Sequence, residues 1–362
     1  MKTIKEGLVM LHIPDSANDV FYNPEMEMSR DISVAFLQSI EDKKMSVCDL
    51  LSATGARAVR YAKEVDSVER VLANDGNEVA EKYISENASI NNVGKKVFAS
   101  CSGANTFLAS HKNEFDFIDI DPFGSPVYYL EEFSRTVKPN SYAAITATDC
   151  GALSGVFADT CFRRYGVKLG RTECFKEVGI RNLLGVVASS LASRGFSIKP
   201  LLSHVTLHYF RIILEINGGI RNETKRFYHC DKCGYCTFEK ADKCGHKPDE
   251  LGPIWAGKLH DKSACFRILD KLNSGTFGRK TDAKRVLLSI IEEADYPFYY
   301  DVHDMSERFS TDTPSMDGIM RKLRSRGFTV TRTHFSDSAI KTNANISDVN
   351  GLFGTGVDNK HG

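Results

Sequence analysis

Short apolar runs alternate with helix-like stretches between residues 47 and 149. Apolar runs of strand length, separated by segments with helical spacing, are typical of βαβ units in a mostly parallel sheet. We predict strands in the apolar runs at 47–51, 68–73, 96–99, 115–120 and 142–146. We predict helices at 56–63, 127–136 and 173–193, and a further helix that ends at 90. The pattern therefore indicates a doubly wound, Rossmann-like α/β fold.

The pattern changes after residue 195, where two extended segments lead to the pair Gly218-Gly219. A chain of 362 residues exceeds the usual size of a single core, so two domains are expected. We place the boundary before the glycine pair, which gives a first domain at 1–217 and a smaller α/β domain at 218–362. The tail from Thr342 is rich in Asn, Gly and Asp and is expected to be loose.

The overall composition is that of an ordinary globular protein, with 42% hydrophobic and 26% charged residues. Lys plus Arg equals Asp plus Glu, at 47 each, so only a local basic surface can serve a polyanionic partner. The sequence has neither an apolar run of membrane-spanning length nor an N-terminal signal-peptide pattern. We therefore expect a cytoplasmic protein without a membrane partner, and no feature indicates an obligate protein partner.

A turn of small residues, from Ser52 to Gly55, links the first predicted strand to a helix. Backbone N–H groups of such a turn, together with the helix N-terminus, can bind a polar ligand at the carboxyl ends of the strands. The second strand is followed by Asp75, whose carboxylate can accept hydrogen bonds from ribose hydroxyls. Together these features favour a nucleoside cofactor, either NAD or S-adenosylmethionine, over a simple tight turn and a solvated aspartate.

The fourth predicted strand is followed by Asp121-Pro122-Phe123. The exocyclic amine of guanine or adenine is a poor nucleophile, because its lone pair is delocalised into the ring. A carboxylate and a backbone carbonyl can accept its N–H groups and take the released proton, while an aromatic ring stacks on the flipped base. We therefore assign Asp121 as acceptor or general base, the carbonyl of Pro122 as its helper, and Phe123 as the stacking surface. The alternative interpretation is a strand terminator followed by an ordinary turn.

These motifs, in this order, resemble those of the tRNA guanine-N2 dimethyltransferase family, which modifies guanine 26 of tRNA. The resemblance extends over nearly the whole chain, and its most specific motif is 121–126. Further matching motifs lie at 21–31, 51–57, 146–149, 252–255, 259–261, 333–335 and 340–342. The resemblance implies S-adenosylmethionine as the methyl donor, a class I methyltransferase fold and a C-terminal domain that binds tRNA. It leaves open whether one or two methyl groups are transferred.

The resemblance also implies roles for individual residues of the cofactor site. By matching motif, Arg30 contacts the carboxylate of the methionine part, joined by Arg57 at the start of the first helix. Asp75 holds the ribose and Asp121 serves catalysis. Each of these four residues carries a side chain whose charge or hydrogen-bonding capacity suits the assigned role.

The chain departs from the family pattern after the third predicted strand. Relatives place an aspartate there to accept a hydrogen bond from the adenine amine, whereas this chain has Gly103. Ser102 or the backbone of Ala104 is expected to replace that side chain. Asp149, which follows the fifth strand, is expected to line the base pocket or to order its wall.

Four cysteines fall within fifteen residues, at Cys230, Cys233, Cys236 and Cys244. In a chain expected to be cytoplasmic, such a cluster indicates metal ligands before disulfides. Cys230 and Cys233 have the spacing of a zinc knuckle, and tetrahedral zinc needs two further ligands. We expect structural zinc at 230–246, with Cys244 and Cys236 completing the set and His246 as the alternative to Cys236. A degenerate site without metal is the competing interpretation.

A basic segment near the C-terminus carries Lys and Arg without any acid. Apolar spacing predicts a helix that ends at Gly327, followed by an alternating strand. Basic side chains on such a pair suit contacts with phosphates, which add affinity without sequence information. We expect tRNA to contact Arg321, Lys322, Arg324, Arg326 and Arg332. Arg163, Arg164, Lys168 and Arg171 are a candidate extension of this surface beside the active site.

Three other functions compete with RNA methylation. A nicotinamide-dependent oxidoreductase uses the same kind of sheet, but it requires a fuller glycine loop and a proton relay. An adenine-N6 methyltransferase acting on nucleic acid shares the acid-proline-aromatic pattern, and the continuation Gly124-Ser125-Pro126 speaks against it. A non-catalytic RNA-binding protein with a vestigial pocket is distinguished by its failure to bind S-adenosylmethionine.

Overall fold

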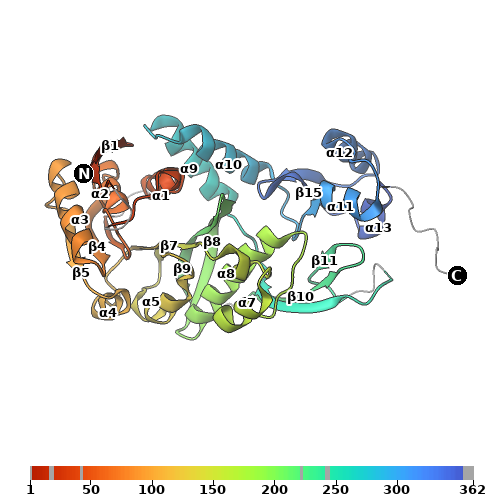
Figure 1. Ribbon diagram of the computed structural model, residues 1–362, viewed down its shortest axis with the longest axis horizontal. Helices are drawn as coiled ribbons and strands as arrows, with labels where there is room; N and C mark the ends of the chain where they lie inside the picture. The colour runs from red at the N-terminus through yellow and green to blue at the C-terminus, as the bar shows by residue number, and fades with distance from the viewer. Residues whose placement is uncertain (1, 16–19, 41–43, 221–222, 241–244, 354–362) are drawn as a thin grey trace.

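The computed structural model describes residues 2–15, 20–40, 44–220, 223–240 and 245–353. Figure 1 shows an elongated molecule, with the N-terminal elements at one end and α12 and α13 at the other. Within the described ranges, no helix is both long and apolar enough to cross a membrane.

A seven-stranded sheet of order β5-β4-β3-β6-β7-β9-β8 forms the centre of the fold (Figure 1). Its strands are β3 (Met45–Asp49), β4 (Val68–Asp75), β5 (Val97–Cys101), β6 (Phe117–Ile120), β7 (Ser141–Ala147), β8 (Phe196–Thr206) and β9 (Tyr209–Gly218). The first five run parallel, whereas β9 is antiparallel to both of its neighbours. The sheet confirms the predicted doubly wound α/β fold, and every strand predicted between residues 47 and 149 is present.

Helices cover both faces of this sheet, because successive strand residues point to opposite sides. On β3, Val47 packs into one buried cluster and Cys48 into the other. Packed on the Val47 side are α1 (Glu27–Gln38), α2 (Ala56–Glu64) and α3 (Glu78–Ile90). Packed on the Cys48 side are α4 (Ala104–Ser110), η2 (Pro126–Tyr129), α5 (Leu130–Thr136), α6 (Cys150–Leu153), α7 (Ala158–Tyr165) and α8 (Phe175–Ala192). The helix predicted at 173–193 corresponds to α8.

The N-terminus forms an antiparallel hairpin that is attached to the Val47 side. Its strands are β1 (Lys2–Glu6) and β2 (Val9–Ile13), and η1 (Pro24–Met26) then leads into α1. The side chains of Asn87 in α3 and of Asn91, which caps the C-terminus of α3, each accept a hydrogen bond from the backbone of β2 and donate one to it. The hairpin therefore extends the layer that holds α1 and its buried side chains.

The chain beyond Gly218 packs on both faces of the large sheet before it forms a smaller unit. A three-stranded sheet of β10 (Thr224–Cys230), β11 (Tyr235–Thr237) and β12 (Asp249–Trp255) lies against α8. Two helices, α9 (Lys262–Ser274) and α10 (Lys280–Glu292), lie against α1 on the opposite side. The last strand of the large sheet, β9, thus ends next to the expected domain boundary. The buried clusters on both faces of the sheet nevertheless include residues from beyond that boundary.

The last elements surround a third buried cluster. They are β13 (Tyr300–Asp301), α11 (Val302–Phe309), α12 (Met316–Ser325), β14 (Val330–Thr333), β15 (Ser336–Thr342) and α13 (Ile346–Asn350). The expectation of a loose tail from Thr342 is wrong as far as residue 353, because Ile346 and Val349 are 1% exposed and anchor α13. Residues 354–362 lie outside the described ranges.

Candidate active site

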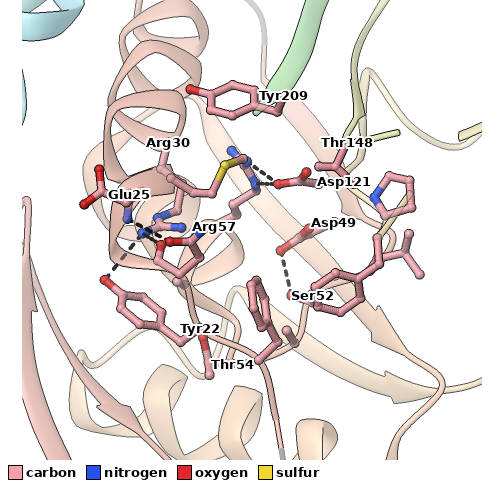
Figure 2. Close-up of a pocket in the computed structure, with 18 of the residues that line it drawn as sticks. Tyr22, Glu25, Arg30, Asp49, Ser52, Thr54, Arg57, Asp121, Thr148 and Tyr209 are labelled. Atoms are coloured by element: carbon pink, nitrogen blue, oxygen red, sulfur yellow. Dashed lines mark hydrogen bonds and ion pairs between the residues drawn. The ribbon is translucent and has the colours of Figure 1, made fainter. Parts of the chain in front are cut away.

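A pocket with a volume of about 550 Å³ opens at the carboxyl ends of the parallel strands (Figure 2). Parallel strands bring their carboxyl ends to one edge, so polar residues that end or follow β3, β4, β6 and β7 meet there. The turn between β8 and β9 and the segment before α1 close the pocket. It is lined by Phe21, Tyr22, Asn23, Glu25, Met26, Arg30, Asp49, Leu51, Ser52, Ala53, Thr54, Ala56, Arg57, Asp75, Asp121, Pro122, Phe123, Tyr129, Thr148, Leu207, His208 and Tyr209.

The turn that follows β3 forms the floor of this pocket. Ser52 Oγ donates a hydrogen bond to Asp49 Oδ2 at 2.6 Å, and Ala53 N donates to Asp75 Oδ2 at 2.9 Å. Gly55 precedes α2 with a positive φ of 77°, and a Cβ there would lie 3.1 Å from the Cα of Ile84. Ser52 and Asp75 therefore line the pocket, where the sequence placed them. Gly55 does not line the pocket, but its backbone conformation shapes the turn.

Arg57 and Asp121 form an ion pair inside the pocket and point toward each other (Figure 2). Nε of Arg57 donates to Asp121 Oδ2 at 3.1 Å, and Nη2 donates to the same oxygen. Burial opposes the charge on Arg57, but the carboxylates of Asp121 and Asp119 outweigh this effect and hold its pKa well above the usual value. Nη1 of Arg57 is buried and makes no hydrogen bond within the described residues. The pair therefore fixes the carboxylate of Asp121 at the pocket, while Nη1 of Arg57 lies 3.9 Å from Oδ2 of the buried Asp119.

Two aromatic rings mark the outer wall of the pocket. Phe123 is 73% exposed, and its ring meets that of Phe21 edge to face with centroids 4.5 Å apart. Thr148 Oγ1 accepts a hydrogen bond from Gly124 N at 2.6 Å and so joins this wall to the end of β7. An exposed ring held at the edge of a polar pocket is suited to stacking on a planar base.

Arg30 lines the pocket, but most of its guanidinium is already engaged. Nε and Nη2 donate to the two carboxylate oxygens of Glu6, each at 2.6 Å, and Nη2 also donates to the backbone oxygen of Asn23. Arg30 and Arg60 hold the pKa of Glu6 down to about 2, although burial acts in the opposite direction. The β1 strand thereby fixes the orientation of Arg30, a role that local sequence pattern did not indicate.

Asp49 is a pocket residue that the sequence analysis did not select. Its side chain is 1% exposed, and burial together with the neighbouring Asp119 raises its pKa to about 7. Asp119 itself is held by Arg211, whose Nη1 and Nη2 donate to it at 2.8 and 2.6 Å. The predicted strand at 47–51 placed Asp49 in its interior, whereas β3 ends at Asp49 and so brings its side chain to the pocket.

Ala104 and Asp149 lie outside the lining of this pocket. Ala104 begins α4 beside the half-buried Ser102, whose backbone oxygen accepts a hydrogen bond from Asn74. Asp149 accepts hydrogen bonds from Arg164 and Tyr165, at 2.7 and 2.6 Å. Asp149 thus orders the wall next to the pocket, through residues of α7.

The cysteine cluster divides between two sides of the β10–β11 hairpin. Cys230, Cys233 and His246 bring their ligand atoms within 4.8 Å of one another, and Cys230 Sγ lies 3.7 Å from His246 Nδ1. Cys236 is not in this group: its Sγ lies 3.2 Å from that of Cys174. The preference for Cys236 over His246 is therefore corrected, because neighbouring strand residues alternate sides and Cys236 packs into the core under α8. Cys244 lies outside the described residues.

The helix of the basic segment, α12, lies at the other end of the molecule from α1 and α2, which carry Arg30 and Arg57 of the pocket (Figure 1). Its expected helix and strand are α12 and β14, and all five basic side chains are exposed. Arg332 pairs with Asp317 at 3.3 Å, and Arg324 and Arg326 donate to backbone oxygens. The five residues are thus exposed on α12, at its C-terminal end and on β14, and none of them lines the pocket.

The sheet and the pocket define the class of protein: an α/β enzyme of the class I S-adenosylmethionine-dependent methyltransferase type. The family model of N2,N2-dimethylguanosine tRNA methyltransferases matches residues 3–353, so the chain belongs to that family. The chain is 34% identical to the tRNA (guanine(26)-N(2))-dimethyltransferase of Methanobrevibacter smithii, over 98% of this chain and 97% of the relative. It is 35% identical to the enzyme of the same name from Thermococcus kodakarensis, over 94% of this chain and 96% of the relative.

A solved structure matches the fold over the same length. The complex of Trm1 from Pyrococcus horikoshii with S-adenosyl-L-methionine superposes with a TM-score of 0.90 at 32% sequence identity. The match covers 96% of this chain and 98% of the other. The predicted class I methyltransferase fold with an additional C-terminal region is therefore confirmed, and so is the family suggested by the motifs.

Proposed function

We propose that the pocket at the edge of the large sheet transfers methyl groups from S-adenosylmethionine to N2 of guanine 26 in tRNA. Membership of the family over residues 3–353 makes the chain a tRNA (guanine(26)-N2)-dimethyltransferase that uses this donor. The observation that carries the residue assignment is the position of Asp121, which lines the pocket and is held by Arg57 through one oxygen only. Relatives are named as dimethyltransferases, so two successive transfers are the proposed outcome.

Asp121 accepts an N–H of the guanine amino group and takes the proton released when the nitrogen is methylated. Arg57 binds Oδ2, while no hydrogen bond of the described residues occupies Oδ1, which is left for the substrate. The carbonyl of Pro122 accepts the second N–H, and Phe123 stacks on the flipped base. These roles follow from one segment, because 121–123 forms the pocket edge at the end of β6.

The residues of the pocket fit S-adenosylmethionine, which supplies an electrophilic methyl group when it is bound. Asp75 lies at the end of β4 to accept hydrogen bonds from the ribose. In the turn from Ser52 to Gly55, the N–H groups of Ser52, Ala53 and Gly55 already donate within the protein, so Thr54 is proposed as the backbone donor to the cofactor. Arg57 and Arg30, which both line the pocket, are proposed to face the carboxylate of the methionine part with their positive charges. Ser102 and the backbone of Ala104 are proposed to bind the adenine edge from beyond the pocket lining.

The cluster of Cys230, Cys233 and His246 is proposed to hold structural zinc. Two thiolates and an imidazole are three of the four ligands that a tetrahedral zinc site uses. The knuckle between the cysteines is formed, since Gly234 adopts a φ of 72° and its N–H donates to the Cys230 oxygen at 2.8 Å. Cys244, two residues before His246, is proposed as the fourth ligand.

The C-terminal part is proposed to bind tRNA through the basic residues of α12 and β14. Residues 1–217 and 218–362 are proposed as methyltransferase and tRNA-binding domains, and a cytoplasmic location is consistent with the substrate. Phosphate contacts from exposed arginines add affinity without reading sequence.

The experiment that tests the function is incubation of the full chain with unmodified tRNA and labelled S-adenosylmethionine, followed by nucleoside analysis. We expect N2-methylguanosine and N2,N2-dimethylguanosine at position 26. A tRNA in which guanine 26 is replaced by adenine is the matched control and should accept no label. Label in N6-methyladenosine would instead support an adenine enzyme.

A further inference from the structure

Highly exposed aromatic side chains are concentrated in the segments that follow β6 and β7, the strands whose carboxyl ends lead into the pocket. Among the described residues, the aromatic side chains that are more than 60% exposed all lie between 123 and 162: Phe123, Tyr128, Phe157 and Phe162. Phe123 is already part of the pocket. The other three, called the aromatic patch, are 61–63% exposed and contact no ligand site described above. Exposed large apolar side chains in segments next to a binding pocket are candidates for contact with the bound partner.

The patch is held rigidly against the catalytic segment. Tyr165 of α7 donates to Asp149 at 2.6 Å and accepts a hydrogen bond from Ser125 Oγ at 2.8 Å. Ser125 belongs to the same turn as Asp121, so α7 is fixed to the loop that carries the proposed base. The ring of Phe157 packs on Gly151, where an added Cβ would lie 2.6 Å from Cε2. One side of that ring is thereby covered, and the ring has a defined orientation.

The patch is also continuous with the pocket wall. Cys150, at the start of α6, donates from its thiol to the backbone oxygen of His208 at 3.0 Å. His208 and Leu207 line the pocket, and Leu207 is 61% exposed. A substrate that enters the pocket past these residues therefore has to extend over neighbouring surface, which includes α6 and α7.

Resting on the proposed function, we infer that the aromatic patch binds the nucleotides of tRNA that flank the methylated guanine, by stacking on their bases. Flipping one base into the pocket unstacks its neighbours, and aromatic rings replace the lost stacking partners. The charge of α7 suits this occupant, because Arg163 and Arg164 outnumber its single acid, Asp159. Arg163 is exposed next to Phe162 and supplies a positive charge for the adjoining phosphates.

The first test measures KM for unmodified tRNA and Kd for S-adenosylmethionine in full-length variants. Phe157→Ala and Phe162→Ala should each raise KM for tRNA by about tenfold or more, as expected for loss of a base stack, and leave the cofactor Kd unchanged. The matched control is Phe266→Ala on α9, which removes a ring that is 56% exposed away from the patch and should leave KM unchanged. Phe162→Leu should behave like Phe162→Ala, because an apolar side chain without a ring does not stack.

A second test reads stacking directly and needs no turnover. Phe162→Trp keeps an aromatic ring at this position and should report tRNA binding as quenching of its fluorescence, because Trp255 is 2% exposed and gives a constant background. Unchanged fluorescence on saturation with tRNA would overturn the inference, as would an unchanged KM in the Phe157→Ala/Phe162→Ala double variant. Binding of a protein to the patch, with no change of fluorescence when tRNA is added, would also overturn the inference. If the wild-type chain methylates no tRNA, the proposed function fails instead.

Discussion

Arg57 holds Asp121 by Oδ2 alone, although the two residues are 64 positions apart in the sequence. The same guanidinium also donates to Ser29 Oγ at 3.2 Å and lies 3.9 Å from Asp119. The carboxylate is therefore oriented by a buried cation, while its second oxygen stays at the pocket edge. Arg57 is thus proposed as a positioning residue for Asp121 as much as a ligand for the cofactor.

Replacing Asp121 by Asn should lower kcat by about a hundredfold or more, because an amide accepts a proton poorly. The change keeps the size of the side chain, so Kd for S-adenosylmethionine, measured by calorimetry, should change little. Asp66→Asn, at an exposed acid in a surface turn, is the control and should keep full activity. Equal losses of cofactor binding and of turnover would assign Asp121 a structural role.

Replacing Arg57 by Met should destabilise the protein and slow transfer together. Removing one partner of a buried ion pair costs about 3–5 kcal/mol, because the remaining charge loses its compensation. In the Arg57→Met/Asp121→Asn double variant the loss should be smaller than the sum of the single losses, since the two side chains form one interaction. Urea unfolding of the four proteins measures this coupling, and strictly additive losses would contradict it.

The pH dependence of cofactor binding should report on Asp49. Its pKa of about 7 means that Asp49 is largely protonated in mildly acidic solution and ionised in alkaline solution. The positive charges of S-adenosylmethionine favour the ionised form, so affinity should rise as pH increases through 7. In the protein without cofactor the sign is opposite: the folded state keeps a proton that the unfolded chain loses near 3.8, so stability declines as pH rises toward 7.

Asp49→Asn should flatten both profiles, because the amide does not titrate in this range. Calorimetric titrations and thermal unfolding between pH 5 and 8.5 measure the two effects. A profile that keeps its slope in the variant would assign the titration to another group.

The zinc content of cysteine variants should depend on which side of the β10–β11 hairpin the replaced thiol lies. Cys233→Ser should lose about one equivalent of zinc, because a structural site needs all of its ligands. Cys236→Ser should retain the metal, since that thiol lies against Cys174 and away from His246. Elemental analysis of the purified variants checks both outcomes, and loss of zinc from Cys236→Ser alone would restore the original ligand assignment.

The salt dependence of tRNA binding should locate the basic surface. Each of Arg321→Gln and Lys322→Gln should weaken binding and reduce the slope of log Kd against log salt by about 1, as expected for one lost phosphate contact. Arg285→Gln on α10, where the side chain is 81% exposed, is the control. Unchanged slopes in both test variants would show that these residues of α12 do not contact tRNA phosphates.

The sequence predicted those parts of the structure that depend on local pattern. Strand and helix periodicity predicted β3 to β7, and strand-end positions brought Ser52, Asp75 and Asp121 to one pocket. Pairings between distant residues could not be predicted in this way, as Glu6 with Arg30 shows. Cys236 was misassigned because spacing along the chain does not reveal which side of a hairpin a thiol faces. The tail was misjudged because its polar composition concealed two buried anchors, Ile346 and Val349.

The packing of α9 and α10 against α1 means that the catalytic half of the chain is not self-contained. Asp31, which adjoins Arg30 in α1, accepts a hydrogen bond from the backbone N–H of Arg279 at 2.8 Å. Cutting the chain at residue 217 would strip that acceptor of its donor and uncover the apolar flank on which Ile268 and Leu287 rest. The proposed tRNA-binding and methyltransferase parts therefore share one scaffold, and we expect a chain shortened to residue 217 to lose methyl transfer as well as tRNA binding.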